Sequence, residues 1–322
     1  SRERRRAALT LREACYGQAG CYRLVYGESD GLSGLVIDRF GPVVVVQTAT
    51  AGMDRHLPLI LSALETLLAP RSIVLKQDSG ARSLEGLEET VVVHGQPLDD
   101  AVPLEENGVR FLAPVLEGQK TGWFYDHREN RARLASLAKG ARVLDAFSYV
   151  GAWGLTALAQ GADALVAVDG SQRALEHLEA NAAALGLSDR VETVRGDAFK
   201  VLEAQADAGE RFDVVIVDPP ALIKRRKDLK AGQHGYERLA RQALRLTAPG
   251  GLCLFASCSL HYDRAMMTDT LRSAARHTDR SLQMLWSHGA GMDHPVHPAI
   301  PETDYLKATL ARVSPPGRGG AF

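Results

Sequence analysis

Four aspartates, each at or near the end of a predicted strand, have the spacing of a binding site. They are Asp145, Asp169, Asp197 and Asp218. The carboxyl ends of parallel strands meet at one edge of a sheet, where ligands bind, so these side chains are expected to lie together. Carboxylates there can accept hydrogen bonds from ribose hydroxyls or face a cationic ligand. A helix N-cap explains any single one, Asp197 above all, but four in series favour a binding site.

A turn that carries glycine follows the first of these strands. It contains Gly151 and Gly154, and glycine lets a backbone approach a ligand closely because it has no Cβ. The two glycines do not match the G-x-G-x-x-G pattern of dinucleotide sites. Asp169 comes about 20 residues after the turn, where a carboxylate can hold the two hydroxyls of a ribose. The pattern therefore predicts a site for an adenosine cofactor.

The thiol of Cys258 is the candidate nucleophile. It follows a predicted strand at residues 251–257, which is expected to lie beside the strand that ends before Asp218. A thiolate adds to electron-poor carbons and is also a good leaving group. Most cysteines at strand ends are small buried hydrophobes, and Cys253 is interpreted in that way.

Alternating strands and helices must position these groups, which is typical of a parallel sheet covered by helices. The second half of the chain therefore predicts a Rossmann-like α/β domain with a mainly parallel, seven-stranded sheet. Its strands are predicted at residues 142–147, 164–168, 191–195, 212–217 and 251–257, with a terminal pair at 283–286 and 306–313, and its helices at 153–159, 172–185, 198–205 and 237–246.

The first half of the chain has a different pattern, with short strands around one helix, which predicts a smaller α+β domain. Its strands are predicted at residues 22–26, 35–38, 43–48, 72–76 and 90–94, and its helix at 57–68. The predicted domains are a helical lead-in at 1–18, the small domain at 19–112 with a possible role in RNA binding, the large domain at 113–313, and a disordered tail at 314–322 rich in glycine and proline.

Composition excludes several classes of protein. The chain has 322 residues and a net charge of −1, so any contact with nucleic acid must come from local basic patches. Such patches occur at residues 2–6 and 224–227, although a solvated surface explains most charge runs. Four cysteines without ligand spacing predict a cytoplasmic protein with no bound metal, and the pair His294 and His297 has no evident third ligand. No apolar run is long enough to span a membrane.

A segment upstream of the large domain carries a resemblance to a known family. Lys120-Thr121-Gly122 is followed by Phe124, Asp126 and Arg128, which resembles the K-T-G-[YF]-[YF]-x-D-x-R segment of large-subunit ribosomal RNA methyltransferases. The acidic strand ends resemble those of class I S-adenosylmethionine-dependent methyltransferases. Ser257-Cys258-Ser259 matches the motif that carries the nucleophile in RNA 5-methylcytosine methyltransferases. From about residue 2 to 313 the chain is similar to the bacterial 23S ribosomal RNA cytosine-C5 methyltransferases.

This resemblance implies S-adenosylmethionine as cofactor, ribosomal RNA as partner, and methylation of cytosine C5 through covalent addition of Cys258 to C6, with Asp218 near the methyl group. The cofactor-binding residues that it implies are Gln119, Lys120, Thr121, Gly122, Phe124, Asp126, Arg128, Asp145, Phe147, Ser148, Tyr149, Gly151, Asp169, Gly170, Ser171, Asp197, Ala198, Asp218 and Pro219. The predicted RNA-binding residues are Lys224, Arg225, Arg226 and Lys227. A homodimer is compatible with the sequence, which does not fix the oligomeric state.

Three departures from the family pattern leave alternatives open. No second cysteine follows Asp218-Pro219-Pro220, so the base that removes the C5 proton is Asp218, a nearby lysine or water. Ala221 stands where relatives commonly have lysine, a role that Lys224 could take. The small PUA domain with which relatives usually begin is not expected within these 322 residues. Methylation of another atom, such as guanine N7 or an exocyclic amine, and a non-catalytic assembly factor remain rival hypotheses.

Overall fold

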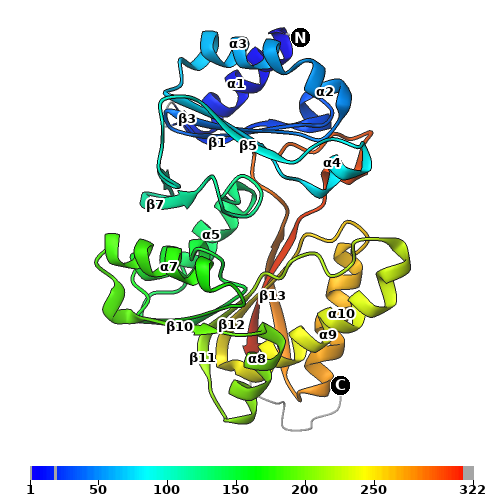
Figure 1. Ribbon diagram of the computed structural model, residues 1–322. Coiled ribbons are helices and arrows are strands. Elements are labelled where there is room, and N and C mark those ends of the chain that lie inside the picture. Colours follow the sequence, from blue (N-terminus) through cyan, green and yellow to red (C-terminus); the bar gives the residue numbers. More distant parts are fainter. Residues whose placement is uncertain (1, 18–19, 315–322) are drawn as a thin grey trace. The chain divides into compact units, whose positions relative to one another are not determined.

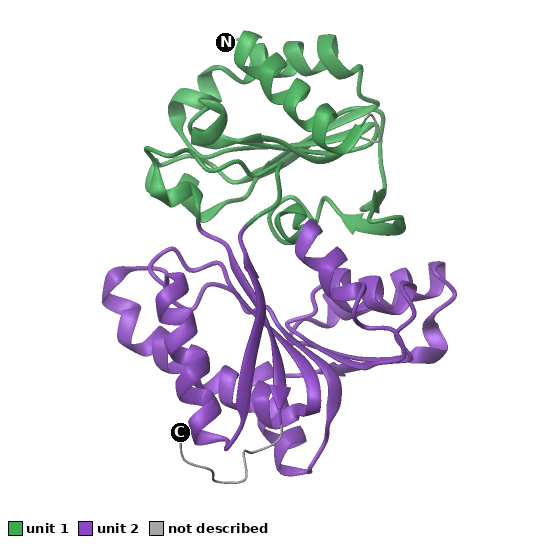
Figure 2. Cartoon of the chain, turned by 180° about the vertical axis from the view of Figure 1, so that it is seen from behind, with its two compact units in different colours: residues 1–128, 290–304 green, residues 129–289, 305–322 purple. Residues whose placement is uncertain are grey.

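The computed structural model describes residues 2–17 and 20–314, which form two compact units (Figure 2). Unit 1 holds the described residues up to Arg128 together with Ala290–Asp304. Unit 2 holds Glu129–Gly289 and the described residues from Tyr305 on.

Unit 2 is an α/β domain built on a seven-stranded sheet (Figure 1). The strand order is β10-β9-β8-β11-β12-β14-β13, and β14 is the strand that runs antiparallel to β12 and β13. The strands are β8 (Arg142–Ala146), β9 (Ala164–Asp169), β10 (Val191–Arg195), β11 (Phe212–Val217), β12 (Thr247–Ser257), β13 (Ser281–His288) and β14 (Lys307–Ser314). Chain order reverses beside β8, which lies between β9 and β11, and ligands bind at such a point.

Helices cover this sheet because its central strands are apolar on both sides. In β11, Val214 to Val217 are all buried, as parallel strands between two helical layers must be. The helices are α5 (Arg128–Ala135), α6 (Ala152–Ala159), α7 (Gln172–Ala184), α8 (Ala198–Asp207), α9 (Leu229–Leu246) and α10 (Arg264–His277). Side chains of α8, α9 and α10 share one core with β8, β11 and β12, whereas α6 and α7 lie outside that cluster and contact β8, β9 and β10.

Unit 1 is an α+β domain with a five-stranded sheet in the order β1-β2-β3-β4-β5 and a separate β6-β7 hairpin. Its strands are β1 (Cys21–Tyr26), β2 (Leu35–Phe40), β3 (Val43–Thr48), β4 (Ser72–Gln77), β5 (Thr90–Gly95), β6 (Ala101–Glu106) and β7 (Val109–Pro114), and its helices are α1 (Arg2–Tyr16), α2 (Ala51–Arg55), α3 (Leu57–Leu68) and α4 (Gly80–Leu84). Ala8 of α1 and Leu64 of α3 pack with Val44 and Val46 of β3 in one apolar core.

The structure draws the unit boundaries differently from the sequence. Residues 113–128 and 290–304 belong to unit 1, not to the domain predicted at 113–313. The cause is a set of long-range hydrogen bonds: Tyr125 Oη donates to the carbonyl of Arg39, and Arg12 Nη2 donates to the carbonyl of Asp293 over 2.8 Å. The predicted lead-in is also part of this unit, because α1 packs on β1. The predicted tail lies outside the described residues apart from Ser314, which ends β14.

Helices α2, α4, α5 and α10 and the β6-β7 hairpin were not predicted, although the sequence carries signals for the last two. Helix α10 begins after Asp263, whose carboxylate caps it by accepting from the backbone N–H of Met266, and Met267 and Leu271 are buried with helical spacing. The β6-β7 hairpin turns at Asn107 and Gly108, which have φ values of 53° and 75°. Asn-Gly is the pair that a two-residue hairpin turn with positive φ prefers.

Candidate active site

Asp145 ends the first strand of the sheet in unit 2 and lies fully buried. Its Oδ2 accepts a 3.0 Å hydrogen bond from the backbone N–H of Gly154, the first-turn glycine of α6. A Cβ at Gly154 would lie 2.5 Å from Cδ1 of Leu165, so a larger residue would force that buried side chain to shift. The other oxygen of Asp145 and the buried Oγ of Ser148 have no hydrogen-bond partner in the described protein. Buried polar atoms normally have partners, so these two suit a bound polar ligand.

Burial raises the pKa of Asp145 to about 8, and the nearby carboxylates of Asp218 and Asp169 add to that effect. Because this folded pKa lies above the ordinary unfolded value near ~4, the stabilising proton is bound at low pH. The free energy of unfolding of the ligand-free protein should therefore fall as pH rises from about 4 to about 8, by up to ~1.4 kcal/mol per pH unit. Asp145→Asn should flatten this dependence, measured as Tm between pH 5 and 8. An unchanged slope in this variant, matched against Asp189→Asn on the surface, would contradict the assignment.

Asp169 ends β9, beside β8, and is held by the turn that follows β8. Its Oδ2 accepts from the backbone N–H of Tyr149 at 2.9 Å, and its Oδ1 accepts from that of Ser171 at 2.8 Å. Tyr149 and Phe147 have positive φ values of 50° and 60°, which are unusual for residues with a side chain. Strained backbone of this kind gathers at ligand-binding turns. The carboxylate of Asp169 is thus fixed at the strand edge where the sequence predicted it.

Asp197 is the N-cap of α8, where its Oδ1 accepts from the backbone N–H of Phe199 at 2.9 Å. The sequence offers a helix N-cap as the alternative explanation for Asp197. Its carboxylate is exposed and follows the end of β10, at the predicted edge of the sheet. The ring of Phe199 meets that of Phe147 edge to face, with centroids 6.2 Å apart. These two rings therefore join the turn after β8 to the first turn of α8.

Asp218 follows β11 and is oriented by the indole of Trp153, which donates from Nε1 to Oδ2 over 3.0 Å. Trp153 lies on α6 directly before Gly154, so one helical turn contacts both Asp145 and Asp218. The guanidinium of the buried Arg131 lies 6.0 Å from the ring of Trp153. Three of the predicted carboxylates are therefore placed around the first turn of α6 and the end of β9.

Cys258 lies one residue past β12, the neighbour of β11 in the sheet. Val217 pairs with Phe255, so Asp218 is level with Ala256 and Cys258 lies two residues beyond that level. Cys258 is partly exposed, whereas Cys253, inside the strand, is buried in the apolar core. Burial raises the pKa of Cys253 to about 12, which makes it a poor nucleophile. The structure therefore separates the two thiols in the way that the sequence predicted.

Sequence reasoning missed the residues that hold Cys258. Ser257 and Ser259 on either side are fully buried, and both bond to the hydroxyl of Tyr236, at 2.7 and 2.6 Å. Lys307, directly opposite Ser257 in β14, donates from Nζ to the carbonyl of Ser259 over 2.6 Å. The serines beside the cysteine were visible as a motif, but nothing in the sequence indicated that Tyr236 and Lys307, which are distant along the chain, contact them.

The four basic residues of the predicted RNA-binding run, Lys224 to Lys227, are all exposed. They follow the segment after Asp218, and Arg225 pairs with Asp228 at 3.3 Å at the start of α9. Helix α9 begins at Leu229, whereas its start was predicted from the sequence at residue 237. The difference arises because a helical turn follows the basic run directly. The basic segment is thus a short surface connection between β11 and α9.

The Lys120 segment belongs to unit 1, where two of its predicted cofactor ligands have other partners. Thr121 Oγ1 donates to the buried carboxylate of Asp38 over 2.6 Å. Arg128 is buried, donates to the carbonyl of Cys21 and stacks over the ring of Tyr16 at 4.0 Å. Both side chains therefore have structural roles in unit 1. Because Arg128 is buried, it does not form an ion pair on the surface of a helix.

The remaining residues of that segment differ in exposure. Gln119 and Lys120 are exposed, Phe124 is partly exposed, and Asp126 is buried. Gly122 has a φ of 105°, and a Cβ there would lie 2.6 Å from the carbonyl oxygen of Pro114. Only glycine fits this turn, which presents Lys120 at the surface of unit 1.

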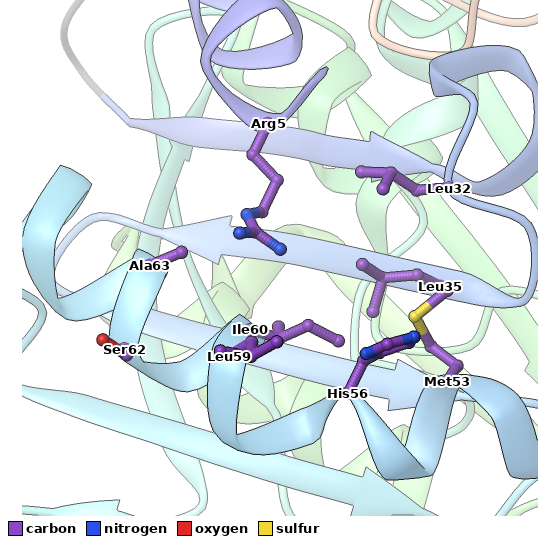
Figure 3. A pocket seen from close by; sticks show the side chains of 9 residues that line it. All are labelled: Arg5, Leu32, Leu35, Met53, His56, Leu59, Ile60, Ser62 and Ala63. Atoms are coloured by element: carbon purple, nitrogen blue, oxygen red, sulfur yellow. The ribbon is translucent and has the colours of Figure 1, made fainter. Parts of the chain in front are cut away.

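Unit 1 also contains a cavity of about 520 Å³ that the sequence gave no reason to expect (Figure 3). Arg5 extends into it from α1, and His56 borders it at the start of α3, above an apolar lining that includes Leu35, Met53 and Ile60. The lining contains no cysteine or carboxylate. Its residues differ from those predicted to bind the cofactor or to act on a base.

Among residues 2–17 and 20–314, no group of three or more His, Cys, Asp or Glu could hold a metal ion. His294 instead lies buried with Nδ1 2.8 Å from the carboxylate of Asp293. None of the described helices combines the length and the apolar character needed to cross a bilayer.

The chain is similar to several known proteins. Ribosomal RNA large subunit methyltransferase I of Aeromonas salmonicida is 39% identical over 293 residues, covering 90% of this chain and 74% of the relative. Ribosomal RNA large subunit methyltransferase of Deinococcus radiodurans is 37% identical, and the match covers 96% of this chain and 76% of the relative. A crystal structure of a methyltransferase complexed with SAH superposes with a TM-score of 0.84 at 21% identity, covering 97% of this chain and 80% of that one.

The family model described as "Conserved hypothetical protein 95" matches residues 129–229. It is a different family from the cytosine-C5 methyltransferases, so this match does not support the predicted target atom. The predicted class I fold and the prediction of S-adenosylmethionine as cofactor are confirmed at the level of family and fold. The chain belongs to the ribosomal RNA large subunit methyltransferase I family, and its unit 2 has the fold of class I S-adenosylmethionine-dependent methyltransferases.

Proposed function

We propose that this protein methylates C5 of a cytosine in large-subunit ribosomal RNA and that Cys258 adds covalently to C6 of that base. The observation that carries the proposal is the placement of a partly exposed thiol at the end of β12, in the strand next to the one that presents Asp218. The names of the relatives, at 39% and 37% identity, support ribosomal RNA as the substrate class.

The edge of the sheet in unit 2 suits S-adenosylmethionine. Asp169 is fixed at the end of β9 where a carboxylate can accept from both ribose hydroxyls. Asp145 Oδ1 and Ser148 Oγ, buried without protein partners, can face the polar amino-acid end. Proposed contributors around them are Phe147, Tyr149, Gly151, Gly170, Ser171, Asp197, Ala198, Asp218 and Pro219. In unit 1, Gln119, Lys120, Gly122, Phe124 and Asp126 stay predicted cofactor-binding residues through the resemblance of their segment to that of the family, and Gln119 and Lys120 are exposed.

Cys258 supplies the nucleophile that the reaction requires. Cytosine C5 does not attack a methyl group while the ring is aromatic, so a bond from Sγ to C6 must form first. Bound S-adenosylmethionine supplies the methyl group as a sulfonium electrophile. The C5 proton then leaves to a base and the bond from Sγ to C6 breaks, which restores the free thiol. A nitrogen target would attack directly and would give Cys258 no role.

Asp218 is the proposed base for the C5 proton. It is the carboxylate nearest in register to Cys258, and the hydrogen bond from Trp153 fixes one of its oxygens. No cysteine follows it within Asp218-Pro219-Pro220-Ala221 to serve instead. A carboxylate held in a defined direction is able to take a proton from carbon.

The basic run from Lys224 to Lys227 is proposed to bind RNA phosphates. Arg226→Ala combined with Lys227→Ala should raise KM for RNA about 10-fold and reduce the salt dependence of binding by about two ion equivalents, because each phosphate contact releases counterions. The kcat at saturating RNA should stay unchanged. Steady-state kinetics across a salt series measures both values. Arg173→Ala on α7 is the matched surface control, and equal effects from the two changes would contradict the assignment.

The function itself is tested by product analysis. Large-subunit ribosomal RNA lacking the modification is incubated with the protein and S-adenosylmethionine, and its nucleosides are then separated by mass spectrometry. The proposal expects 5-methylcytidine as the methylated product. A methylguanosine or methyladenosine as the product would contradict the proposal and favour methylation of another atom. Cofactor binding without any methylation would favour the hypothesis of a non-catalytic assembly factor.

A further inference from the structure

The hydroxyl of Tyr236 joins the two segments that carry the proposed catalytic groups. We propose that Tyr236 is a positioning residue that locks the Ser257-Cys258-Ser259 segment to the segment after Asp218, so that the thiol is held in the direction of attack. This inference rests on the proposed function, because it concerns how the same nucleophile is oriented.

The hydrogen bonds of this hydroxyl use its full capacity. It accepts from Ser257 Oγ at 2.7 Å and from the backbone N–H of Leu222 at 3.4 Å, and its 2.6 Å contact with Ser259 Oγ uses its single proton. Burial raises the pKa of Tyr236, so the hydroxyl keeps that proton at neutral pH. One phenol group thus contacts both segments.

The serines complete the connection. Ser259 Oγ accepts from the backbone N–H of Ile223 at 3.1 Å, and Ser257 Oγ accepts from the backbone N–H of Ser259 at 3.1 Å. Leu222 and Ile223 come shortly after Asp218, so the bond of Ile223 to Ser259 joins the two segments directly and the bonds of Tyr236 join them through α9. Cys258, between the two buried serines, is left partly exposed. We call Tyr236, Ser257 and Ser259 the serine clamp.

Packing alone does not explain the hydroxyl. The ring of Tyr236 is fully buried, stacks on that of Tyr262 with centroids 4.2 Å apart, and meets Phe255 edge to face. A phenylalanine would fill the same apolar space without a polar group that must be satisfied. Tyr262 is the internal comparison, because its hydroxyl bonds to Thr270 on α10 instead of to either catalytic segment.

Helix α9 brings Tyr236 close to the segment after Asp218. A Cβ at Gly232, one turn before Tyr236, would lie 2.2 Å from Ile223 Cγ1 and 2.8 Å from the carbonyl oxygen of Leu222. The absence of a side chain at that position lets the segment lie directly against the helix. The clamp is therefore anchored in a helix of 18 residues and not in a loop.

Tyr236→Phe removes the hydroxyl and keeps the ring. A displacement of about 1 Å in a reacting group can cost about 100-fold in rate, so we expect Cys258 to add to C6 10- to 100-fold more slowly. The direct readout is the rate of covalent complex formation with RNA that contains 5-fluorocytidine, whose fluorine cannot leave as a proton and so holds the complex. Dissociation constants for S-adenosylmethionine and RNA should change less than about 2-fold, because the clamp contacts neither.

Tyr262→Phe is the matched control, since it removes a buried hydroxyl from the same stacked pair. A Tyr236→Phe rate at least 10-fold below that of Tyr262→Phe supports the clamp. Equal rates, or a loss that appears equally in cofactor and RNA binding, overturn it. Ser259→Ala and Ser259→Thr provide a second pair, in which threonine retains the hydroxyl and should restore most of the rate that alanine loses.

Failure of the clamp and failure of the proposed function give different results. If the wild-type protein methylates RNA but forms no complex with 5-fluorocytidine RNA, the covalent function is wrong and the clamp proposal falls with it. If the wild-type protein forms the complex, and Tyr236→Phe and Tyr262→Phe form it at equal rates, only the clamp proposal is wrong.

Discussion

Replacing Cys258 with alanine is expected to lower kcat at saturating RNA by at least about 1000-fold, because in the proposed mechanism the bond from Sγ to C6 makes C5 nucleophilic. Binding of S-adenosylmethionine should change by less than about 2-fold, since the acidic strand ends are untouched. Transfer of labelled methyl groups to RNA measures the first value, and calorimetry with the cofactor measures the second.

Cys253→Ala provides the control for that experiment. Cys253 is buried in the same strand, so its loss should lower Tm through a small core cavity while leaving kcat close to that of the wild type. Retention of full activity in Cys258→Ala would contradict the covalent mechanism. Loss of activity in Cys253→Ala at a temperature where it stays folded would show that the strand, and not the thiol, is sensitive.

Asp218→Asn is expected to lower turnover about 100-fold or more and to leave the protein bound to its RNA. If this carboxylate takes the C5 proton, methyl transfer still occurs in the variant but the bond from Cys258 to C6 cannot break. A covalent complex with ordinary RNA should then accumulate, visible as a shift on a denaturing gel. The asparagine can still accept from Trp153 Nε1, so the local hydrogen bond remains.

Two results would contradict the role given to Asp218. Wild-type turnover in Asp218→Asn would mean that a lysine or water takes the proton. Loss of turnover without any accumulated complex would mean that Asp218 acts at a step before methyl transfer, as a cofactor-binding group. Asp189→Asn, on the surface of unit 2, controls for loss of a carboxylate in general.

The candidate site in unit 2 was largely predictable because its groups stand at fixed places along the chain. Strand β10 and helix α3 have the bounds expected from their patterns, and Asp145, Asp169 and Cys258 lie at or just past strand ends as predicted. In a parallel sheet, the position of a residue after its strand is enough to place it at the binding edge. Local sequence therefore carried most of this information.

Partners that are distant in sequence could not be predicted in the same way. Tyr236 reaches Ser257 and Ser259 only because α9 packs against β12, and nothing near Tyr236 in the sequence indicates those bonds. Arg128 is a second example of a partner that is distant in sequence. Its motif implied a cofactor ligand, but its buried stacking on Tyr16 depends on α1, more than a hundred residues earlier.

The central claim is that Cys258 attacks a cytosine, and the most direct test is to identify the atoms joined in the trapped complex. RNA with 5-fluorocytidine is incubated with the wild-type protein and S-adenosylmethionine, digested with nuclease and protease, and analysed by tandem mass spectrometry. The account predicts one modified peptide, in which Cys258 carries a methylated fluorocytidine nucleotide. Methyl transfer to RNA with an unmodified Cys258, or a nucleotide attached to another residue, would contradict it.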